Sequence, residues 1–255
     1  MSAWDPAQYL KFGGERLRPA LDLLARIAAE SPDTVYDLGC GPGTVTVLLR
    51  RRWPEARVVG VDSSDTMLAE ARDKHPGIEF VCADIAHFVP DAPAGVIVSN
   101  AALHWLSDHA RLFPGLVSRL APGGVFAAQM PHVNHQTSHV LMAESADAGP
   151  WRDKARAALP RYPDHGAADY YGWLAPLCRA VEVWETVYHH ALAGENAVLE
   201  WMKGAALRPM LARLAPAERD GFLADYGARL ARAYPRRADG VTLFPFRRLF
   251  VVAAK

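Results

Sequence analysis

The 255-residue sequence has few cysteines, no net charge and no long apolar run. Its three cysteines, Cys40, Cys82 and Cys178, are widely spaced and form no Cys-x-x-Cys pair, which argues against a disulfide framework and a thiolate metal site. The 28 basic side chains balance the 28 acidic ones, so the overall charge would not attract nucleic acid or an acidic membrane. The amino terminus lacks a basic segment followed by an apolar run, so we expect a cytoplasmic protein that binds neither nucleic acid nor membrane.

Short apolar runs alternate with helical segments as far as Met130. The predicted strands cover residues 34–38, 57–61, 78–81, 96–98 and 125–130. The helices predicted between them cover residues 44–52, a segment that opens at Ser63-Ser64, and residues 108–120. Such alternation requires right-handed crossovers and a parallel sheet covered on both faces, with ligands bound beyond the carboxyl ends of the strands. The sequence therefore predicts an α/β fold.

The pattern changes after Met130, where helical segments become longer and strands rarer. We expect a single domain over residues 1–255. Its core is predicted to comprise residues of about 31–130 and two further strands, near 181–192 and 248–254. A helical cap is predicted to comprise residues of about 131–180 and 193–243, together with an N-terminal helix over 5–18. No pattern in the sequence indicates an oligomeric state.

A glycine-rich turn, Val-Tyr-Asp-Leu-Gly-Cys-Gly-Pro-Gly, ends the first predicted strand. Its three glycines alternate along the chain: Gly39, Gly41 and Gly43. Three missing Cβ atoms let a ligand approach the backbone closely. A dinucleotide fold requires Gly-x-Gly-x-x-Gly, but Thr44 stands where the third glycine would be. Asp37 would repel a pyrophosphate and suits a ligand that carries an ammonium group and hydroxyls, such as S-adenosylmethionine, which has no phosphate.

Two further aspartates close the next two predicted strands. Asp62 can accept hydrogen bonds from both ribose hydroxyls, a role that would equally suit NAD. Asp84 can accept the adenine amino group, while Ile85 packs on the ring and offers its backbone N–H. Any single aspartate in such a place is more often a helix N-cap or a turn residue. Three of them at successive strand ends, together with the glycines, favour the S-adenosylmethionine interpretation.

These residues resemble the class I S-adenosylmethionine-dependent methyltransferases, through the segments 37–43 and Asn-Ala-Ala-Leu-His-Trp at 100–105. More narrowly, the chain resembles the trans-aconitate 2-methyltransferase family from end to end. The segments that carry this resemblance are Trp4-Asp5-Pro6, Arg16 with Arg18-Pro19, Asp62-Ser63-Ser64, Ser138-His139, Tyr170-Tyr171, Leu207-Arg208-Pro209 and Phe244 to Phe250. The resemblance implies a Rossmann-like methyltransferase fold with a seven-stranded, mostly parallel sheet, an antiparallel last strand and a helical cap. It also implies that one carboxylate of a small polycarboxylic acid, trans-aconitate foremost, is methylated.

The resemblance and the motifs together give two sets of site residues. The cofactor set comprises Arg16, Asp37, Gly39, Gly41, Gly43, Asp62, Ser63, Asp84, Ile85 and Asn100. The substrate set comprises Tyr9, Phe12, His104, Trp105, His139, Tyr170, Tyr171, Arg208 and Arg247. The arginines available to pair with substrate carboxylates are Arg16, Arg18, Arg208, Arg247 and Arg248. No catalytic base is expected, because a carboxylic acid is already ionised at neutral pH.

A histidine-rich loop follows the fifth predicted strand and holds His132, His135 and His139. We expect no metal there, because no carboxylate or thiolate completes the set and this methyl transfer needs no Lewis acid. The loop departs from the family pattern at residues 132–134 and at Thr137, which leaves the acid substrate open. The alternatives are a methyltransferase for another small molecule, a dehydrogenase, and a protein that binds S-adenosylmethionine without turnover.

Overall fold

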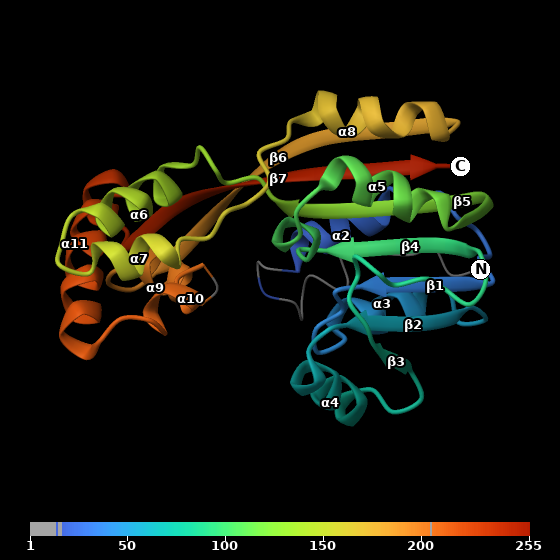
Figure 1. Cartoon of the computed structure of the whole chain (residues 1–255), viewed down its shortest axis with the longest axis horizontal. Coiled ribbons are helices and arrows are strands. Elements are labelled where there is room, and N and C mark those ends of the chain that lie inside the picture. The colour runs from blue at the N-terminus through green and yellow to red at the C-terminus, as the bar shows by residue number, and fades with distance from the viewer. Residues whose placement is uncertain (1–13, 15–16, 205) are drawn as a thin grey trace. The chain divides into compact units, whose positions relative to one another are not determined.

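The computed structural model describes residue 14, residues 17–204 and residues 206–255. Tyr9, Phe12, Arg16 and most of the predicted helix over 5–18 lie outside the described residues. The strands are β1 (Thr34–Leu38), β2 (Arg57–Asp62), β3 (Glu79–Cys82), β4 (Ala94–Asn100), β5 (Leu120–Pro131), β6 (Ala180–Ala193) and β7 (Val241–Ala254). They form one sheet in the order β3-β2-β1-β4-β5-β7-β6 (Figure 1). The pairs from β3 to β5 are parallel and β7 runs antiparallel to β5, so the predicted mostly parallel, seven-stranded sheet is confirmed.

Helices join the strands. The α-helices are α2 (Arg18–Ala25), α3 (Thr44–Arg52), α4 (Asp65–Lys74), α5 (His109–Ser118), α6 (Thr137–Asp147), α7 (Arg152–Ala157), α8 (Ala167–Leu174), α9 (Ala197–Lys203), α10 (Arg208–Leu211) and α11 (Pro216–Ala233). Two short 3-10 helices are η1 (Leu103–Trp105) and η2 (Ala175–Leu177). Within the described part of the chain, none of the helices combines the length and the apolar character that a membrane crossing requires.

The chain divides into two compact units. The core unit comprises the described residues up to Pro131, Pro163–Thr186 and Arg248–Lys255, and the cap unit comprises His132–Tyr162 and Val187–Arg247. Residues 187–192, predicted as part of a core strand, lie in the cap unit, and residues 163–180, predicted as cap, lie in the core unit. The physical reason lies in α8, which packs against α5 and buries Tyr170 and Leu174 in the same apolar cluster as the central strands.

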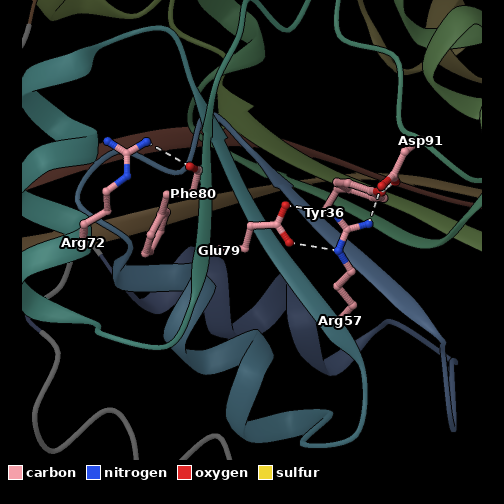
Figure 2. Close-up of polar contacts among 6 residues, drawn as sticks. All are labelled: Tyr36, Arg57, Arg72, Glu79, Phe80 and Asp91. Carbon is pink, nitrogen blue, oxygen red and sulfur yellow. Dashed lines mark hydrogen bonds and ion pairs between the residues drawn. The ribbon is translucent and has the colours of Figure 1, made fainter.

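Phe80 of β3 packs under the glycine-rich turn. A Cβ on Gly60 would lie 2.6 Å from Cδ1 of this ring, and a Cβ on Gly43 would lie 3.0 Å from its Cζ. Arg72 of α4 donates a hydrogen bond of 2.9 Å to the Phe80 carbonyl (Figure 2). The two glycines therefore admit the phenyl ring, and the ring fixes β3 and α4 beside the turn.

Polar contacts tie together the amino ends of β2 and β3 (Figure 2). Arg57 donates two hydrogen bonds to Glu79, of 2.9 and 2.8 Å, and a third of 2.6 Å to Asp91. The Tyr36 hydroxyl donates to Asp91 at 2.7 Å, and burial raises the pKa of this phenol to about 12. Because these contacts lie at the starts of the strands, the carboxyl ends remain for the glycine turn and a ligand.

Candidate cofactor and substrate site

The glycine turn after β1 has left-handed backbone at all three glycines, with φ of +76° at Gly39, +53° at Gly41 and +82° at Gly43. Their surroundings differ. A Cβ on Gly39 would lie 2.1 Å from the Cβ of Ala102, the residue that precedes η1, whereas a Cβ on Gly41 would meet nothing within 4 Å. Gly39 therefore allows two strand ends to approach each other, and the backbone at Gly41 is the part of the turn that a ligand can reach.

Asp62 at the end of β2 fixes this turn. Its Oδ2 accepts a hydrogen bond of 2.8 Å from the Gly41 N–H, and its Oδ1 accepts one of 2.9 Å from the Ser64 N–H. The hydroxyl of Ser64 in turn caps α4, while Ser63 is exposed. The carboxylate of Asp62 is half-buried, and each of its oxygens keeps a further lone pair. The predicted bonds to two ribose hydroxyls are therefore compatible with the contacts already made.

Asp37 lies behind the turn rather than at its surface. The side chain is 1% exposed, and its Oδ2 accepts a hydrogen bond of 2.6 Å from the Thr46 hydroxyl on α3. Burial raises the pKa of this carboxyl to about 7, and the charge of Asp62 adds to the rise, while the Thr46 bond opposes it. The sequence predicted direct contact with the cofactor, but the enclosed carboxylate would act on a ligand through its charge.

The end of β3 also reaches the turn. Asp84 is exposed, and the N–H of Ala86 donates 2.9 Å to its Oδ1 and lowers the pKa of this carboxyl. Ile85 is 9% exposed, and its Cδ1 would lie 3.4 Å from a Cβ on Gly39. The apolar Ile85 and the exposed carboxylate of Asp84 thus lie next to each other beside the turn. This arrangement is compatible with the prediction that Ile85 packs on adenine and Asp84 binds its amino group.

Three polar side chains are linked at the end of β4, and the sequence did not point to the middle one, Gln129. Gln129 of β5 donates to the Asn100 side chain, and Nη1 of Arg248 in β7 donates 3.3 Å to the Gln129 Oε1. Gln129 is 1% exposed and Arg248 is 7% exposed. This series of hydrogen bonds orients the Asn100 amide at the carboxyl end of β4. The available signal was a lone glutamine inside an otherwise apolar strand.

The predicted substrate residues fall in both units. His104 and Trp105 of η1 belong to the core unit, with His104 buried, Trp105 exposed and ring centroids 4.6 Å apart. His139 belongs to the cap unit, and burial lowers its pKa to about 4, so the imidazole is neutral at physiological pH. Arg208 and Arg247 are exposed on the cap unit. His104 and Trp105 lie in η1, which follows directly after the end of β4 that carries Asn100.

Tyr170 is a core residue in the structure and not an open substrate contact. The side chain is 2% exposed, and its hydroxyl lies 2.7 Å from Nδ1 of the fully buried His109. The other ring nitrogen, Nε2, lies 2.9 Å from the carbonyl of Leu103, so it carries the proton and the tyrosine donates to Nδ1. Burial lowers the pKa of His109, which keeps the ring neutral. Tyr171, by contrast, is 54% exposed.

A Tyr170→Phe variant is expected to lose about 1–3 kcal/mol of unfolding free energy, because Nδ1 of His109 is left buried without a donor. The matched control is Tyr171→Phe, which removes an exposed hydroxyl and is expected to stay within about 0.5 kcal/mol of the parent. Urea denaturation measures both values. Equal stability of the two variants would contradict the hydrogen bond from Tyr170 to His109.

The described residues contain no group of three or more His, Cys, Asp and Glu side chains arranged to hold a metal ion. His139 makes a contact of 3.2 Å with the neighbouring Ser138 hydroxyl, and its ring packs against Tyr162 with centroids 5.9 Å apart. His132 and His135 instead line a cavity of the cap unit. The three histidines of the loop therefore have different surroundings.

Comparisons with known proteins agree with the geometry. A family model described as a methyltransferase domain matches residues 35–124. The chain is 50% identical to a trans-aconitate 2-methyltransferase of Rhodopseudomonas palustris (strain BisB18) and 49% identical to one of Azoarcus sp. (strain BH72), with 100% of each chain covered in both cases. Among solved structures, an S-adenosylmethionine dependent methyltransferase from Mesorhizobium loti matches with a TM-score of 0.53 at 21% identity, over 95% of this chain and 99% of that one, which shows the shared fold.

The matched domain contains the glycine turn and the ends of β2, β3 and β4, where the candidate cofactor residues gather. The two relatives match the cap unit as well, because their similarity extends over the whole chain. The predicted enzyme class and its predicted cofactor are confirmed. The chain belongs to the trans-aconitate 2-methyltransferase family of S-adenosylmethionine-dependent methyltransferases.

Proposed function

We propose that this protein methylates one carboxylate of trans-aconitate, giving a monomethyl ester and S-adenosylhomocysteine. The observation that carries the proposal is the identity of 49–50% over the full length to two proteins named trans-aconitate 2-methyltransferase. Full-length similarity bears on the substrate because the glycine turn and its aspartates account only for the cofactor. The similarity therefore includes the cap unit, which the methyltransferase domain at 35–124 does not reach.

The chemistry suits a site without a general base. A carboxylic acid with a pKa of about 4 is ionised at neutral pH and is its own nucleophile. The cofactor supplies an electrophilic methyl group on a positively charged sulfur. Transfer to the carboxylate oxygen would break the carbon–sulfur bond, leave its electron pair on sulfur and move no proton. The protein contributes alignment, which can supply roughly 7–11 kcal/mol, and exclusion of water.

The residues around the turn fit such a cofactor. We propose that the backbone at Gly41, with open space beside it, lies against the methionine part, and that Asp62 accepts the ribose hydroxyls. Ile85 and Asp84 would hold the adenine ring and its amino group. Asn100, oriented by Gln129, would meet the ammonium group. Asp37 would compensate the positive charge from behind the turn.

We also propose that the reaction takes place in the cytoplasm. All three cysteines of the chain are free, as expected where the glutathione pool keeps thiols reduced. The proposed substrate is a small carboxylate, so no macromolecular partner is needed for turnover.

The function is tested by incubating the protein with methyl-labelled S-adenosylmethionine and a panel of small acids. The panel contains trans-aconitate, saturated tricarboxylates and unsaturated monocarboxylates, and mass spectrometry identifies the ester. We expect labelled monomethyl ester from trans-aconitate, with a kcat/KM at least about 10-fold above that of the monocarboxylates. Turnover of another acid alone would overturn the substrate, and absence of any ester would overturn the reaction. Thermal stabilisation by NAD and not by S-adenosylhomocysteine would indicate a dehydrogenase instead.

A further inference from the structure

A cavity of about 260 Å³ lies wholly within the cap unit. It is bordered by the loop that follows β5, by the residue that ends α11 and by β7. The polar side chains that line it include His132, Asn134, His135, Thr137, Tyr234 and Arg247. Its volume is near the lower end of the range of about 300–1,000 Å³ typical of ligand pockets, which suits a small acid better than a nucleoside or a peptide.

The described residues that line the cavity include a positively charged arginine and no negatively charged side chain. Their side chains include a guanidinium, two imidazoles, two amides and two hydroxyls. Each of these groups can donate a hydrogen bond. A guanidinium fits a planar carboxylate with two parallel bonds. The chemistry therefore matches an anion that carries more than one carboxylate.

The backbone of Arg247 is held by hydrogen bonds at both its carbonyl and its N–H. Its carbonyl accepts a hydrogen bond of 3.0 Å from the His132 N–H, and its own N–H donates 3.4 Å to Oε1 of Gln136. The amide nitrogen of Gln136 donates to the carbonyl of Pro245, two residues earlier in β7. The loop and the strand are thus joined at three points, and the guanidinium extends from a fixed backbone.

The Tyr234 hydroxyl provides a second, independent observation. This oxygen is buried and has no hydrogen-bond partner among the described residues. Its ring is fixed by an edge contact with Phe244, with centroids 5.3 Å apart. A buried hydroxyl without a partner costs free energy that a bound acceptor would recover. Tyr234 borders this cavity and also a smaller one of about 70 Å³ in the cap unit, and an acceptor within reach of the hydroxyl would recover this cost.

We propose that this cavity binds carboxylate groups of a small polycarboxylic acid, with Arg247 and Tyr234 as its main donors and His132 and His135 beside them. The proposal rests on the proposed function, because it names where the acid substrate is recognised. It also assigns a purpose to the loop residues 132–137 that depart from the family pattern. Arg208, the other arginine predicted for the substrate on the cap unit, does not line the cavity.

The test measures binding of trans-aconitate to the full chain saturated with S-adenosylhomocysteine, by calorimetry, together with KM and kcat. Arg247→Gln is expected to raise the dissociation constant and KM about 10- to 100-fold, since a charge-assisted bond to carboxylate is lost. Tyr234→Phe is expected to raise both about 3- to 10-fold while leaving the protein at least as stable, since its hydroxyl has no partner among residues 17–204 and 206–255 to lose. The affinity for S-adenosylhomocysteine is expected to stay unchanged in both variants.

The matched control is Arg213→Gln, which removes an exposed arginine of the cap unit that does not line the cavity and is expected to bind as the parent does. Unchanged trans-aconitate affinity in both Arg247→Gln and Tyr234→Phe, with ester still formed, would overturn the cavity and leave the proposed function standing. Arg247-dependent binding without any ester would support the cavity and overturn the function. If Arg247→Gln weakened the binding of an unsaturated monocarboxylate by the same factor, the cavity would not be a site for several carboxylates.

Discussion

Gly39→Ala is expected to destabilise the protein by about 2–5 kcal/mol and to weaken S-adenosylhomocysteine binding at least about 10-fold. The new Cβ would lie 2.1 Å from the Cβ of Ala102, a separation that real Cβ atoms do not adopt, so β1 and the segment after β4 must move apart. The left-handed backbone, with φ of +76°, adds strain to any side chain at this position. Urea denaturation and calorimetry measure the two effects.

Two further variants separate the clash from the strain. Ala102→Gly in the Gly39→Ala background removes the opposing Cβ and leaves the Ala102 Cα 3.6 Å away, an ordinary contact, so most of the steric loss should be recovered. Gly41→Ala is the matched control, because its φ of +53° gives similar strain while nothing lies within 4 Å of the new atom. It should cost only about 1–2 kcal/mol of stability while still obstructing the cofactor. If Gly39→Ala proved as stable as Gly41→Ala, the close approach to Ala102 would be refuted.

The glycine turn shows how far the sequence could lead. Asp37, and Thr44 in the place of a third glycine, predicted a phosphate-free cofactor, and the fold and the family agree. The sequence attributed all three glycines to ligand access, whereas the structure distinguishes them: Gly39 meets Ala102, Gly43 meets Phe80 and Gly41 faces open space. Sequence reasoning could not separate them, because the atoms opposite the Cβ positions of Gly39 and Gly43 come from residues 32 to 63 positions away.

Local patterns predicted some elements closely and others only in part, since β5 begins five residues before the predicted 125–130 and β7 seven residues before the predicted 248–254. The helix over 44–52 begins and ends as α3 does, and the strand predicted over 181–192 differs from β6 by one residue at each end. The predicted cap range 131–180 includes α8, whereas the structure places α8 in the core unit, because Tyr170 and Leu174 pack on the core through long-range contacts. Tyr170 was misplaced for the same reason, since its partner His109 lies 61 positions earlier. Sequence spacing alone carries no signal for such a pairing.

Asp37 is expected to make the stability of the ligand-free protein fall as the pH rises from about 4 to 7. Its pKa is about 7 in the folded protein against 3.8 for the model compound, so the folded state holds the proton more tightly than the unfolded chain in this window. The unfolding free energy should therefore decrease by up to about 4 kcal/mol across the window, since one pKa unit corresponds to about 1.4 kcal/mol. Asp37→Asn should remove this decrease, and should be the more stable protein at pH 8. Urea denaturation at pH 5 and pH 8 measures the difference.

Cofactor binding should show the opposite pH dependence. An ammonium group near the turn favours the ionised carboxylate, so binding lowers the pKa of Asp37, releases a proton and becomes tighter as the pH rises from 6 to 8. Calorimetry of S-adenosylhomocysteine binding in two buffers of different ionisation enthalpy counts the released proton.

Asp37→Asn should release none and bind about 10- to 100-fold more weakly at pH 8, because the compensating charge is gone. Asp84→Asn is the comparison variant: its carboxyl is exposed and has a lowered pKa, so the loss it causes should be the same at both pH values. Proton release that persisted in Asp37→Asn would assign the coupling to another group and leave Asp37 a purely structural carboxylate bonded to Thr46.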